Sequence, residues 1–227
     1  MASVPKTYQA FLFDAYGTLF DVHSVVVRAG TGIAGDLQAL SRLWRQKQLE
    51  FTWLRALMER YEDFSRITEA ALRTALAQLQ MEATEPQIQR LLVAYLAPAV
   101  FPDAKAALEA LSHFPRAILS NGTPAMLKAA VHNNGLESYF SSIISVDQVK
   151  TYKPSPKVYQ LGPDLLHLPA GDILFVSSNA WDAAGAKAFG YSVCWCNRPE
   201  NPMDQLGFAP DIVVSALDQI PSCFPYS

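Results

Sequence analysis

The hydrophobic and polar positions of the chain follow two different patterns. In the first and last parts, short apolar runs that end in polar or turn residues alternate with stretches whose apolar residues recur at helical spacing. Strands that alternate with helices favour parallel pairing in one sheet. The predicted strands lie within the segments AFLFDAYG (10–17), RAILSNG (116–122), SIISV (142–146), DILFVSSN (172–179), YSVCWC (191–196) and DIVVSA (211–216).

Helices are expected between these strands. One segment has Pro124 near its start and Gly135 just past its end, which is the usual order of these residues at helix ends. Another helix is expected to open at Pro156. The predicted helices are PDAKAALEALSHF (102–114), TPAMLKAAVHNNG (123–135), SPKVYQLG (155–162) and AWDAAGAKAFG (180–190).

The middle of the chain has only the helical pattern. From about Gly35 to Pro98 there is no strand signal, and apolar residues recur at helical spacing. The spacing of Thr84 and Gln87 is that of a capping box at a helix start. The predicted helices in this region lie in the segments 37–64, 68–81 and 84–96.

Together these patterns predict an α/β fold with a doubly wound, mainly parallel sheet and a Rossmann-like core. A helical segment interrupts this core just after its first strand. We therefore expect an α/β core domain made of residues 1–20 and 98–227, and a helical cap domain made of residues 21–97.

Composition and charge exclude several classes of protein. The chain has 227 residues and a net charge of −3, so it lacks the basic character of a nucleic-acid-binding protein. The first ten residues lack the apolar region of a signal peptide, and no segment approaches the ~18 consecutive apolar residues of a membrane span. We expect a cytoplasmic protein with neither a nucleic-acid nor a membrane partner.

The cysteines do not indicate a disulfide framework or a zinc site. Cys194 and Cys196 lie on a predicted strand, and no second pair of ligands accompanies them. We expect them to be small buried residues of the core.

Polar residues follow the predicted strands at their carboxyl ends. In open α/β sheets these ends meet at one crevice, where ligands bind. A carboxylate, an ammonium group, hydroxyls and an amide gathered there predict covalent or acid–base chemistry on an anionic substrate. Any one of these residues is explained equally well as a turn or capping residue, but the whole set is not. The residues are Asp14, Ser120, Asn121, Lys153, Ser177, Ser178, Asn179 and Asp182.

Four segments, in this order and spacing, resemble the haloacid dehalogenase superfamily: FDAYGTLFDV, LSNGTP, YKPSPKVY and FVSSNAWDA. The segment LWRQKQLEFTWLRAL in the predicted cap is similar to one branch, the L-2-haloacid dehalogenases. The resemblance extends over about residues 8 to 220.

The first motif departs from that of the magnesium phosphatases, which are the majority of that superfamily. Those enzymes carry a second aspartate two positions after the first, where this chain has Tyr16. Mg²⁺ needs several oxygen ligands, and Asp14 and Asp182 beside the positive charge of Lys153 make a poor site. The resemblance to the dehalogenase branch likewise implies no metal and no cofactor.

The resemblance implies a hydrolase that acts on carbon–halide bonds, an (S)-2-haloacid dehalogenase. Asp14 attacks C2 of an L-2-haloalkanoate, halide leaves, and water hydrolyses the resulting aspartyl ester to release a D-2-hydroxy acid. Asp182 is expected to activate the water, oriented by Ser177, Asn179 and Lys153. The expected catalytic residues are Asp14, Thr18, Arg45, Ser120, Lys153, Tyr159, Ser177, Asn179 and Asp182.

The same resemblance implies the substrate site. Arg45 and Asn121 are expected to bind the halide, and Lys153 and Ser120 to bind the substrate carboxylate, together with backbone N–H groups of the turn after Asp14. The expected substrate-binding residues are Ala15, Tyr16, Arg45, Leu49, Phe64, Ser120, Asn121, Lys153 and Trp181. Without the resemblance, Arg45 is explained by a solvated helix face, and Phe64 and Tyr159 by core packing.

Two other functions remain open at this point. One is a metal-dependent phosphatase on the same fold, and the other is a catalytically silent protein that binds small carboxylates. The expected partners are a small 2-haloalkanoate and a halide ion, and the apolar cap helices offer a surface for a homodimer.

Overall fold

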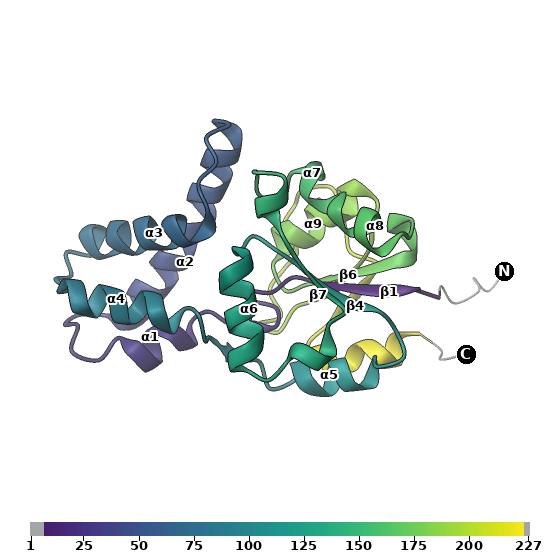
Figure 1. The fold of residues 1–227 in the computed structure, drawn as a ribbon, viewed down its shortest axis with the longest axis horizontal. Coiled ribbons are helices and arrows are strands. Elements are labelled where there is room, and N and C mark those ends of the chain that lie inside the picture. Colours follow the sequence, from purple (N-terminus) through teal and green to yellow (C-terminus); the bar gives the residue numbers. More distant parts are fainter. Residues whose placement is uncertain (1–6, 225–227) are drawn as a thin grey trace.

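The computed structural model describes residues 7–224, and a six-stranded sheet lies at its centre (Figure 1). The strand order is β5-β4-β1-β6-β7-β8, and all neighbouring strands are parallel. The strands are β1 (Ala10–Phe13), β4 (Arg116–Ser120), β5 (Ser142–Ser145), β6 (Ile173–Ser177), β7 (Ser192–Cys196) and β8 (Ile212–Val214). The predicted doubly wound parallel sheet is confirmed. Residues 1–6 and 225–227 of the expected core lie outside the described residues.

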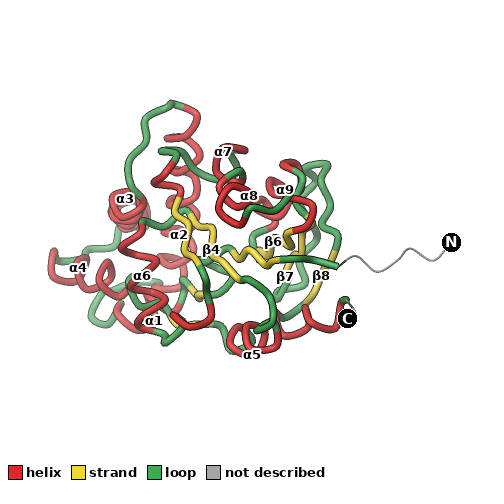
Figure 2. The backbone as a smooth tube through the Cα atoms, turned by 45° about the vertical axis from the view of Figure 1, so that its right-hand side comes forward, coloured by secondary structure: helices red, strands yellow, loops and turns green. Residues whose placement is uncertain are grey.

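Helices cover both faces of this sheet, as a parallel sheet requires. In Figure 1 the helices α7, α8 and α9 lie above the strands and α5 lies below them, and Figure 2 shows the same separation from another side. All four residues of β1 are buried because both faces are covered. These helices are α5 (Ala104–Ala110), α6 (Pro124–Asn133), α7 (Pro156–Tyr159), α8 (Leu161–Leu166) and α9 (Ala180–Phe189).

The helix expected at 155–162 is instead two short helices, α7 and α8. Pro163 has no N–H group to donate to the carbonyl oxygen of Tyr159 four residues earlier. That oxygen accepts a hydrogen bond from the hydroxyl of Tyr191 at 2.6 Å. The carbonyl group that the break leaves without a helical hydrogen bond is therefore bonded by a residue from another part of the chain.

The middle of the chain is helical, as the sequence predicts, and forms the left-hand end of the molecule in Figure 1. Two predicted bounds are wrong. The helix predicted at 37–64 (α2) already ends at Leu57, and the helix predicted at 68–81 (α3) already begins at Phe64. Asp63 sets the start of α3, because its side chain accepts hydrogen bonds from the backbone N–H groups of Ser65 and Arg66. The capping box of Thr84 and Gln87 is confirmed. These helices are α1 (Ser24–Ala29), α2 (Leu37–Leu57), α3 (Phe64–Gln78) and α4 (Glu85–Ala94).

A small two-stranded ribbon lies where the chain enters and leaves this helical region. The strands β2 (Phe20–Asp21) and β3 (Ala99–Val100) pair antiparallel, with Phe20 opposite Val100. Two residues are too few for a recognisable alternation, and the sequence did not predict them. The ribbon brings the segment that enters the helical region and the segment that leaves it together, beside the end of β1.

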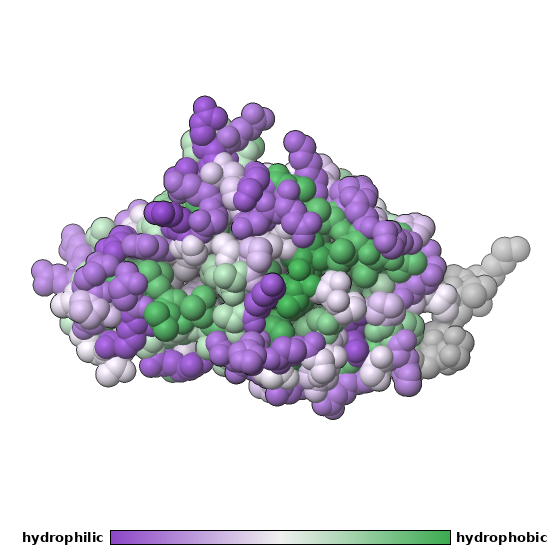
Figure 3. All heavy atoms as spheres, viewed as in Figure 1, coloured by the Kyte–Doolittle hydropathy of each residue, from purple (hydrophilic) through white to green (hydrophobic). Residues whose placement is uncertain are grey.

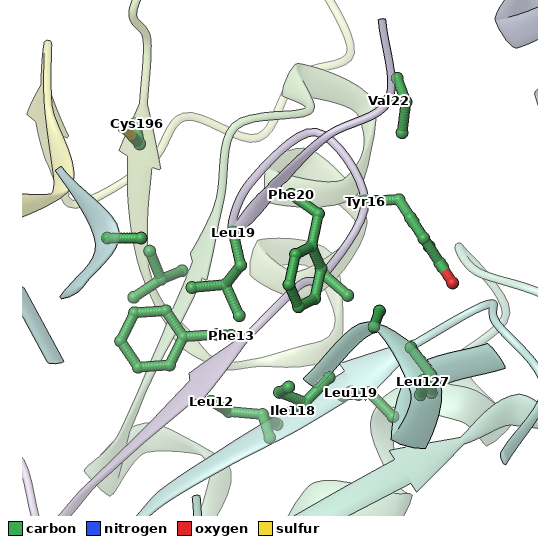
Figure 4. Close-up of a cluster of buried hydrophobic side chains, with 14 of the residues drawn as sticks. Leu12, Phe13, Tyr16, Leu19, Phe20, Val22, Ile118, Leu119, Leu127 and Cys196 are labelled. Carbon is green, nitrogen blue, oxygen red and sulfur yellow. The ribbon is translucent and has the colours of Figure 1, made fainter. Parts of the chain in front are cut away.

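A buried apolar cluster fixes the backbone on both sides of Asp14. Figure 4 shows Phe13, Leu19 and Phe20 within this cluster, and all three are fully buried. In the same figure the ring of Tyr16 extends away from Phe13, with its hydroxyl at the far end. The strand before Asp14 and the turn after it are therefore both anchored by packing.

The outer surface differs between parts of the molecule. In Figure 3 apolar surface, coloured green, gathers over the middle of the molecule, whereas the projecting end of α2 carries mainly polar surface.

Within residues 7–224, no helix combines the length and the apolar character needed to cross a membrane. Cys194 and Cys196 are fully buried, as expected.

Candidate active site

Asp14 is the first residue after β1, at the carboxyl edge of the sheet. Its Oδ1 accepts a hydrogen bond from Nζ of Lys153 at 3.0 Å. Its Oδ2 accepts hydrogen bonds from the hydroxyl of Thr18 and from Nδ2 of Asn179, both at 2.9 Å. Only 6% of Asp14 is exposed, so these bonds replace water around the carboxylate.

The turn after Asp14 depends on Gly17. This residue has a φ of +93°, in the left-handed region that glycine adopts without strain. The turn returns the chain, so that the hydroxyl of Thr18 reaches the carboxylate four residues earlier. A Cβ at position 17 would lie 3.4 Å from Oδ1 of Asn179, which is ordinary van der Waals contact, so the backbone conformation and not lack of space requires glycine here.

Lys153 lies between two carboxylates. Its Nζ donates to Oδ1 of Asp14 at 3.0 Å and to Oδ2 of Asp182 at 2.9 Å, and its side chain is completely buried. Burial by itself would lower the pKa of Lys153, but the negative charges of Asp14 and Asp182 outweigh it and the pKa is raised. The amine is therefore held in its charged form.

Asp182 lies in the first turn of α9 and is also completely buried. Its Oδ1 accepts a hydrogen bond from the hydroxyl of Tyr159 at 2.7 Å, and its Oδ2 accepts one from Lys153. Burial raises the pKa of Asp182; Lys153 opposes this rise, Asp14 adds to it, and the net direction is upward. Asp182 is thus a stronger base than an exposed carboxylate.

The residues at the end of β6 form a second layer around the nucleophile turn. The hydroxyl of Ser177 accepts a hydrogen bond from the N–H of Asn179 at 3.1 Å. The N–H of Ser178 donates to the hydroxyl oxygen of Thr18 at 2.9 Å. With its hydroxyl oxygen so engaged, Thr18 directs its proton to Asp14. The end of β6 therefore orients both donors to Oδ2 of Asp14.

Ser120 is the last residue of β4 and Asn121 follows it, and β4 lies next to β1 in the sheet. Oδ1 of Asn121 accepts a hydrogen bond from the backbone N–H of Lys153 at 3.1 Å, so its NH₂ group is the end not engaged by Lys153. The hydroxyl of Ser120 accepts a hydrogen bond from the N–H of Gly122 at 3.2 Å. Both residues are buried beside the site.

Arg45 reaches the nucleophile turn from α2. Its guanidinium donates to the carbonyl oxygen of Tyr16 at 3.0 Å and to Oε1 of Gln48 at 2.8 Å. Gln48 also accepts from the hydroxyl of Tyr95 at 3.0 Å and donates to the hydroxyl of Thr68 at 2.8 Å. The sequence pattern does not single out Gln48 as a site residue, although its position three residues after Arg45 places both on one helix face.

Aromatic side chains surround this region. The ring of Tyr16 stacks on that of Phe64, with centroids 5.8 Å apart, and Trp181 packs edge-on against Trp53 at 5.4 Å. The hydroxyl of Tyr16 and the indole N–H groups of Trp53 and Trp181 are buried and have no hydrogen-bond partner within residues 7–224. Leu49 is half-buried one turn after Arg45 on α2.

The structure brings most of the expected residues into one hydrogen-bonded group. Ala15 is buried within the turn itself. Ser120 and Leu49 lie beside the group, and their side chains make no hydrogen bond to Asp14, Lys153 or Asp182 in the described structure. The connected residues are Asp14, Thr18, Asn121, Lys153, Tyr159, Ser177, Ser178, Asn179 and Asp182, with Arg45 joined through the backbone of Tyr16.

The donor set does not fit a magnesium ion. A magnesium site needs carboxylate oxygens directed at the metal, but here the ammonium of Lys153 lies on Asp14 and Asp182. Tyr16 stands where a further carboxylate would be needed. Residues 7–224 contain no cluster of three or more His, Cys, Asp or Glu side chains arranged to hold a metal.

Comparison with known proteins finds similarity over almost the whole chain. A model of the haloacid dehalogenase-like hydrolases matches residues 8–190. Haloacetate dehalogenase H-2 of Moraxella sp. (strain B) is 45% identical over 217 residues, covering 95% of this chain and 97% of that protein. The (S)-2-haloacid dehalogenase of Pseudomonas sp. (strain YL) is 45% identical over 214 residues, covering 93% and 92%.

Solved structures agree with these relatives. The L-2-haloacid dehalogenase from Xanthobacter autotrophicus, with chloropropionic acid covalently bound, is 39% identical and has a TM-score of 0.89. The match covers 95% of this chain and 98% of that one. With the buried Asp14–Lys153–Asp182 group at the sheet edge, these similarities show that the chain belongs to the haloacid dehalogenase-like hydrolases, in the branch of the L-2-haloacid dehalogenases.

Proposed function

We propose that this protein hydrolyses L-2-haloalkanoic acids to D-2-hydroxy acids through an ester intermediate on Asp14. The observation that carries the proposal is the Asp14 carboxylate itself, which is buried, hydrogen-bonded to Lys153, and oriented by Thr18 and Asn179. The relatives named as (S)-2-haloacid dehalogenases, and the solved relative with covalently bound chloropropionic acid, support the same reaction.

In the first step, an oxygen of Asp14 forms a bond to C2 of the substrate, and the carbon–halogen bond breaks with its electron pair leaving on the halide. Oδ1 is the better placed nucleophile, because it accepts one hydrogen bond whereas Oδ2 accepts two. Attack from the side opposite the halide inverts C2. Alignment of the reacting groups is worth ~7–11 kcal/mol in such intramolecular attacks.

In the second step, water attacks the carbonyl carbon of the ester, and the bond between that carbon and the C2 oxygen breaks. Asp182 accepts one proton of the water, and the other proton of that water passes to the product oxygen as it leaves, so that Asp14 is regenerated as a carboxylate. The negative charge that develops falls on Oδ2 of Asp14, where Thr18 and Asn179 already donate hydrogen bonds. No second displacement occurs at C2, so the inversion is retained.

The remaining roles concern the carboxylate of the substrate and the halide that leaves it. Arg45 and the NH₂ group of Asn121 would bind the departing halide, with Trp181 beside them. Lys153 uses two of its three N–H bonds on carboxylates, which leaves one for the substrate carboxylate, assisted by Ser120 and by the N–H of Ala15.

The aromatic and aliphatic side chains near the site would line the space for the alkyl chain of the substrate. They are Tyr16, Leu49, Phe64 and Trp181.

We also propose the domain organisation expected from the sequence. Residues 1–20 and 98–227 would form the core that carries the nucleophile, and residues 21–97 the cap that brings in Arg45. The protein would act in the cytoplasm as a homodimer. Exposed apolar side chains on the cap helices, such as Val27, Leu57 and Val93, support a contact between copies.

Release of halide in the presence of a chelator tests this function. The protein should release chloride from L-2-chloropropionate at the same rate with and without EDTA, since Lys153 stands at the carboxylates that a metal would need. Chloride release that requires Mg²⁺, or phosphate ester hydrolysis lost in EDTA, would indicate a phosphatase instead. Binding of the substrate without chloride release would indicate a silent carboxylate-binding protein.

A further inference from the structure

Arg198 lies two residues beyond β7, at the same carboxyl edge of the sheet as the active site. Its Nε and NH2 groups form a bidentate pair with the two carboxylate oxygens of Asp103, both at 2.9 Å. Its guanidinium also lies 4.0 Å from the ring centre of Phe101. These contacts hold the guanidinium plane in one orientation.

The other side of the same guanidinium faces the nucleophile turn. NH2 donates to the carbonyl oxygen of Thr18 at 3.0 Å, and NH1 donates to the hydroxyl of Ser178 at 3.0 Å. A longer contact at 3.5 Å joins NH1 to the carbonyl oxygen of Gly17. Thr18 and Ser178 are the two residues whose hydrogen bond orients the Thr18 hydroxyl towards Asp14.

Arg198 has no donor left for a substrate. A guanidinium has five N–H bonds, and the five contacts to Asp103, Gly17, Thr18 and Ser178 use all of them. Its side chain is only 21% exposed. It therefore acts on the reaction through the turn and not by touching the reacting atoms.

Asp103 connects this arginine to the segment that returns from the helical region. Asp103 lies three residues after β3, and its Oδ2 also accepts a hydrogen bond from the N–H of Leu217 at 2.8 Å. In the same segment, the N–H of Phe101 donates to the carbonyl oxygen of Leu19 at 2.9 Å. The turn after Asp14 is thus fastened to the returning chain at two successive residues, Thr18 and Leu19.

We propose that the Arg198–Asp103 pair is a positioning clamp for the nucleophile, a role that rests on the proposed dehalogenase function. The pair fixes the Thr18 backbone and the Ser178 hydroxyl, and these fix the Thr18 hydroxyl on Oδ2 of Asp14. Loss of the clamp lets the carboxylate turn away from the line of attack on C2. Misplacement by ~1 Å is enough to slow such a reaction by about 10²-fold.

The test compares Arg198→Lys, Arg198→Met and Asp103→Asn with the parent protein on L-2-chloropropionate. We expect kcat and the single-turnover rate of ester formation to fall about 10- to 100-fold in Arg198→Met, with KM within about threefold of the parent. Lysine retains the charge but not the bidentate fork, so Arg198→Lys should recover part of the loss. Asp103→Asn retains the shape and should lose less than Arg198→Met.

Arg116→Lys is the matched control. Arg116 is also half-buried, but among residues 7–224 it donates only to backbone carbonyl oxygens, those of Leu108 and Tyr139, at the opposite end of β4. This variant should lower the melting temperature without changing kcat per folded molecule. A purely structural role for Arg198 would give the same result in Arg198→Lys.

Three outcomes contradict the clamp. The first is a folded Arg198→Lys with the ester-formation rate of the parent. The second is a raised KM at unchanged kcat, which would mean direct substrate binding. The third is additive losses in Arg198→Lys combined with Asp103→Asn, since two parts of one clamp should not add. A parent protein that releases no chloride contradicts the proposed function instead, so the two failures are distinguishable.

Discussion

At the scale of single residues, the ammonium of Lys153 allows two carboxylates, Asp14 and Asp182, to lie close together in a buried site. Two carboxylates without a cation there would repel each other, and one would take up a proton. The ammonium of Lys153 lies on both Asp14 and Asp182, and it lowers the pKa of Asp182 against the larger effect of burial. The sequence predicts these three residues because each follows or flanks the end of a strand. It does not predict Gln48 or Arg198, because Gln48 also bonds to Thr68 and Tyr95, and Arg198 to Asp103 and Thr18, in segments far away in the chain.

The pH dependence of turnover should depend on Tyr159. Its hydroxyl donates to the carboxylate of Asp182 and so favours the charged form, which lowers the pKa of Asp182 against the larger effect of burial. Tyr159→Phe removes this donor and should raise the pKa of Asp182 further. Because the proposed base works when ionised, the acid limb of kcat should move to higher pH.

This shift is measured from kcat on L-2-chloropropionate between about pH 4 and 8, a range that spans ordinary and raised carboxylate pKa values. Tyr139→Phe is the control, because Tyr139 donates to Glu109 at the protein surface. An acid limb that stays in place, or moves to lower pH, in Tyr159→Phe would remove Asp182 from the proposed role of base.

At the scale of elements, the sequence predicts the strands and helices that have a clear local pattern, and it misses those that depend on contacts between distant segments. The six strands of the sheet are predicted because they are apolar runs with polar ends. Helix α1 is missed because its segment SVVVRA contains three β-branched residues, which favour strands. The ribbon of β2 and β3 is missed because each strand has two residues, and its pairing is not a local property.

Helix α2 should act as a rigid carrier of Arg45. Gln48 lies on the same face and accepts hydrogen bonds from Arg45 and Tyr95, so the guanidinium has a fixed direction over the Tyr16 carbonyl. Arg45→Lys should therefore lower kcat by about 10²-fold or more with the fold intact, because a point charge does not replace a planar fork of donors.

The measurement is steady-state chloride release together with the melting temperature. Arg42→Lys, on an exposed position of the same helix, should retain the activity of the parent. Turnover by Arg45→Lys at the rate of the parent would mean that Arg45 does not bind the leaving halide.

At the scale of the whole molecule, the helical region touches the sheet-containing part at more than the active site. The loop after α2 carries Tyr61, whose hydroxyl donates to Asp147 and whose ring lies 5.1 Å from that of Tyr152. Tyr152 in turn donates to the carbonyl oxygen of Glu62 at 2.5 Å. These contacts join the end of α2 to the loop that leads directly into Lys153. The site is therefore completed from two sides of the molecule.

Tyr61→Phe should loosen this connection without disturbing the sheet. The substitution keeps the ring contact with Tyr152 but removes the donor to Asp147, a hydrogen bond to a charged group worth ~1.5–3 kcal/mol. Amide exchange should become faster in both residues 58–63 and residues 146–152, and kcat/KM should fall several-fold, while the amides of β1 exchange as slowly as in the parent.

Tyr139→Phe, which removes a hydroxyl from the far side of the sheet-containing part, should change the exchange of neither loop. Faster exchange confined to 58–63, with kcat/KM unchanged, would mean that the contact stabilises only its own loop and does not help to hold the two sides of the site together.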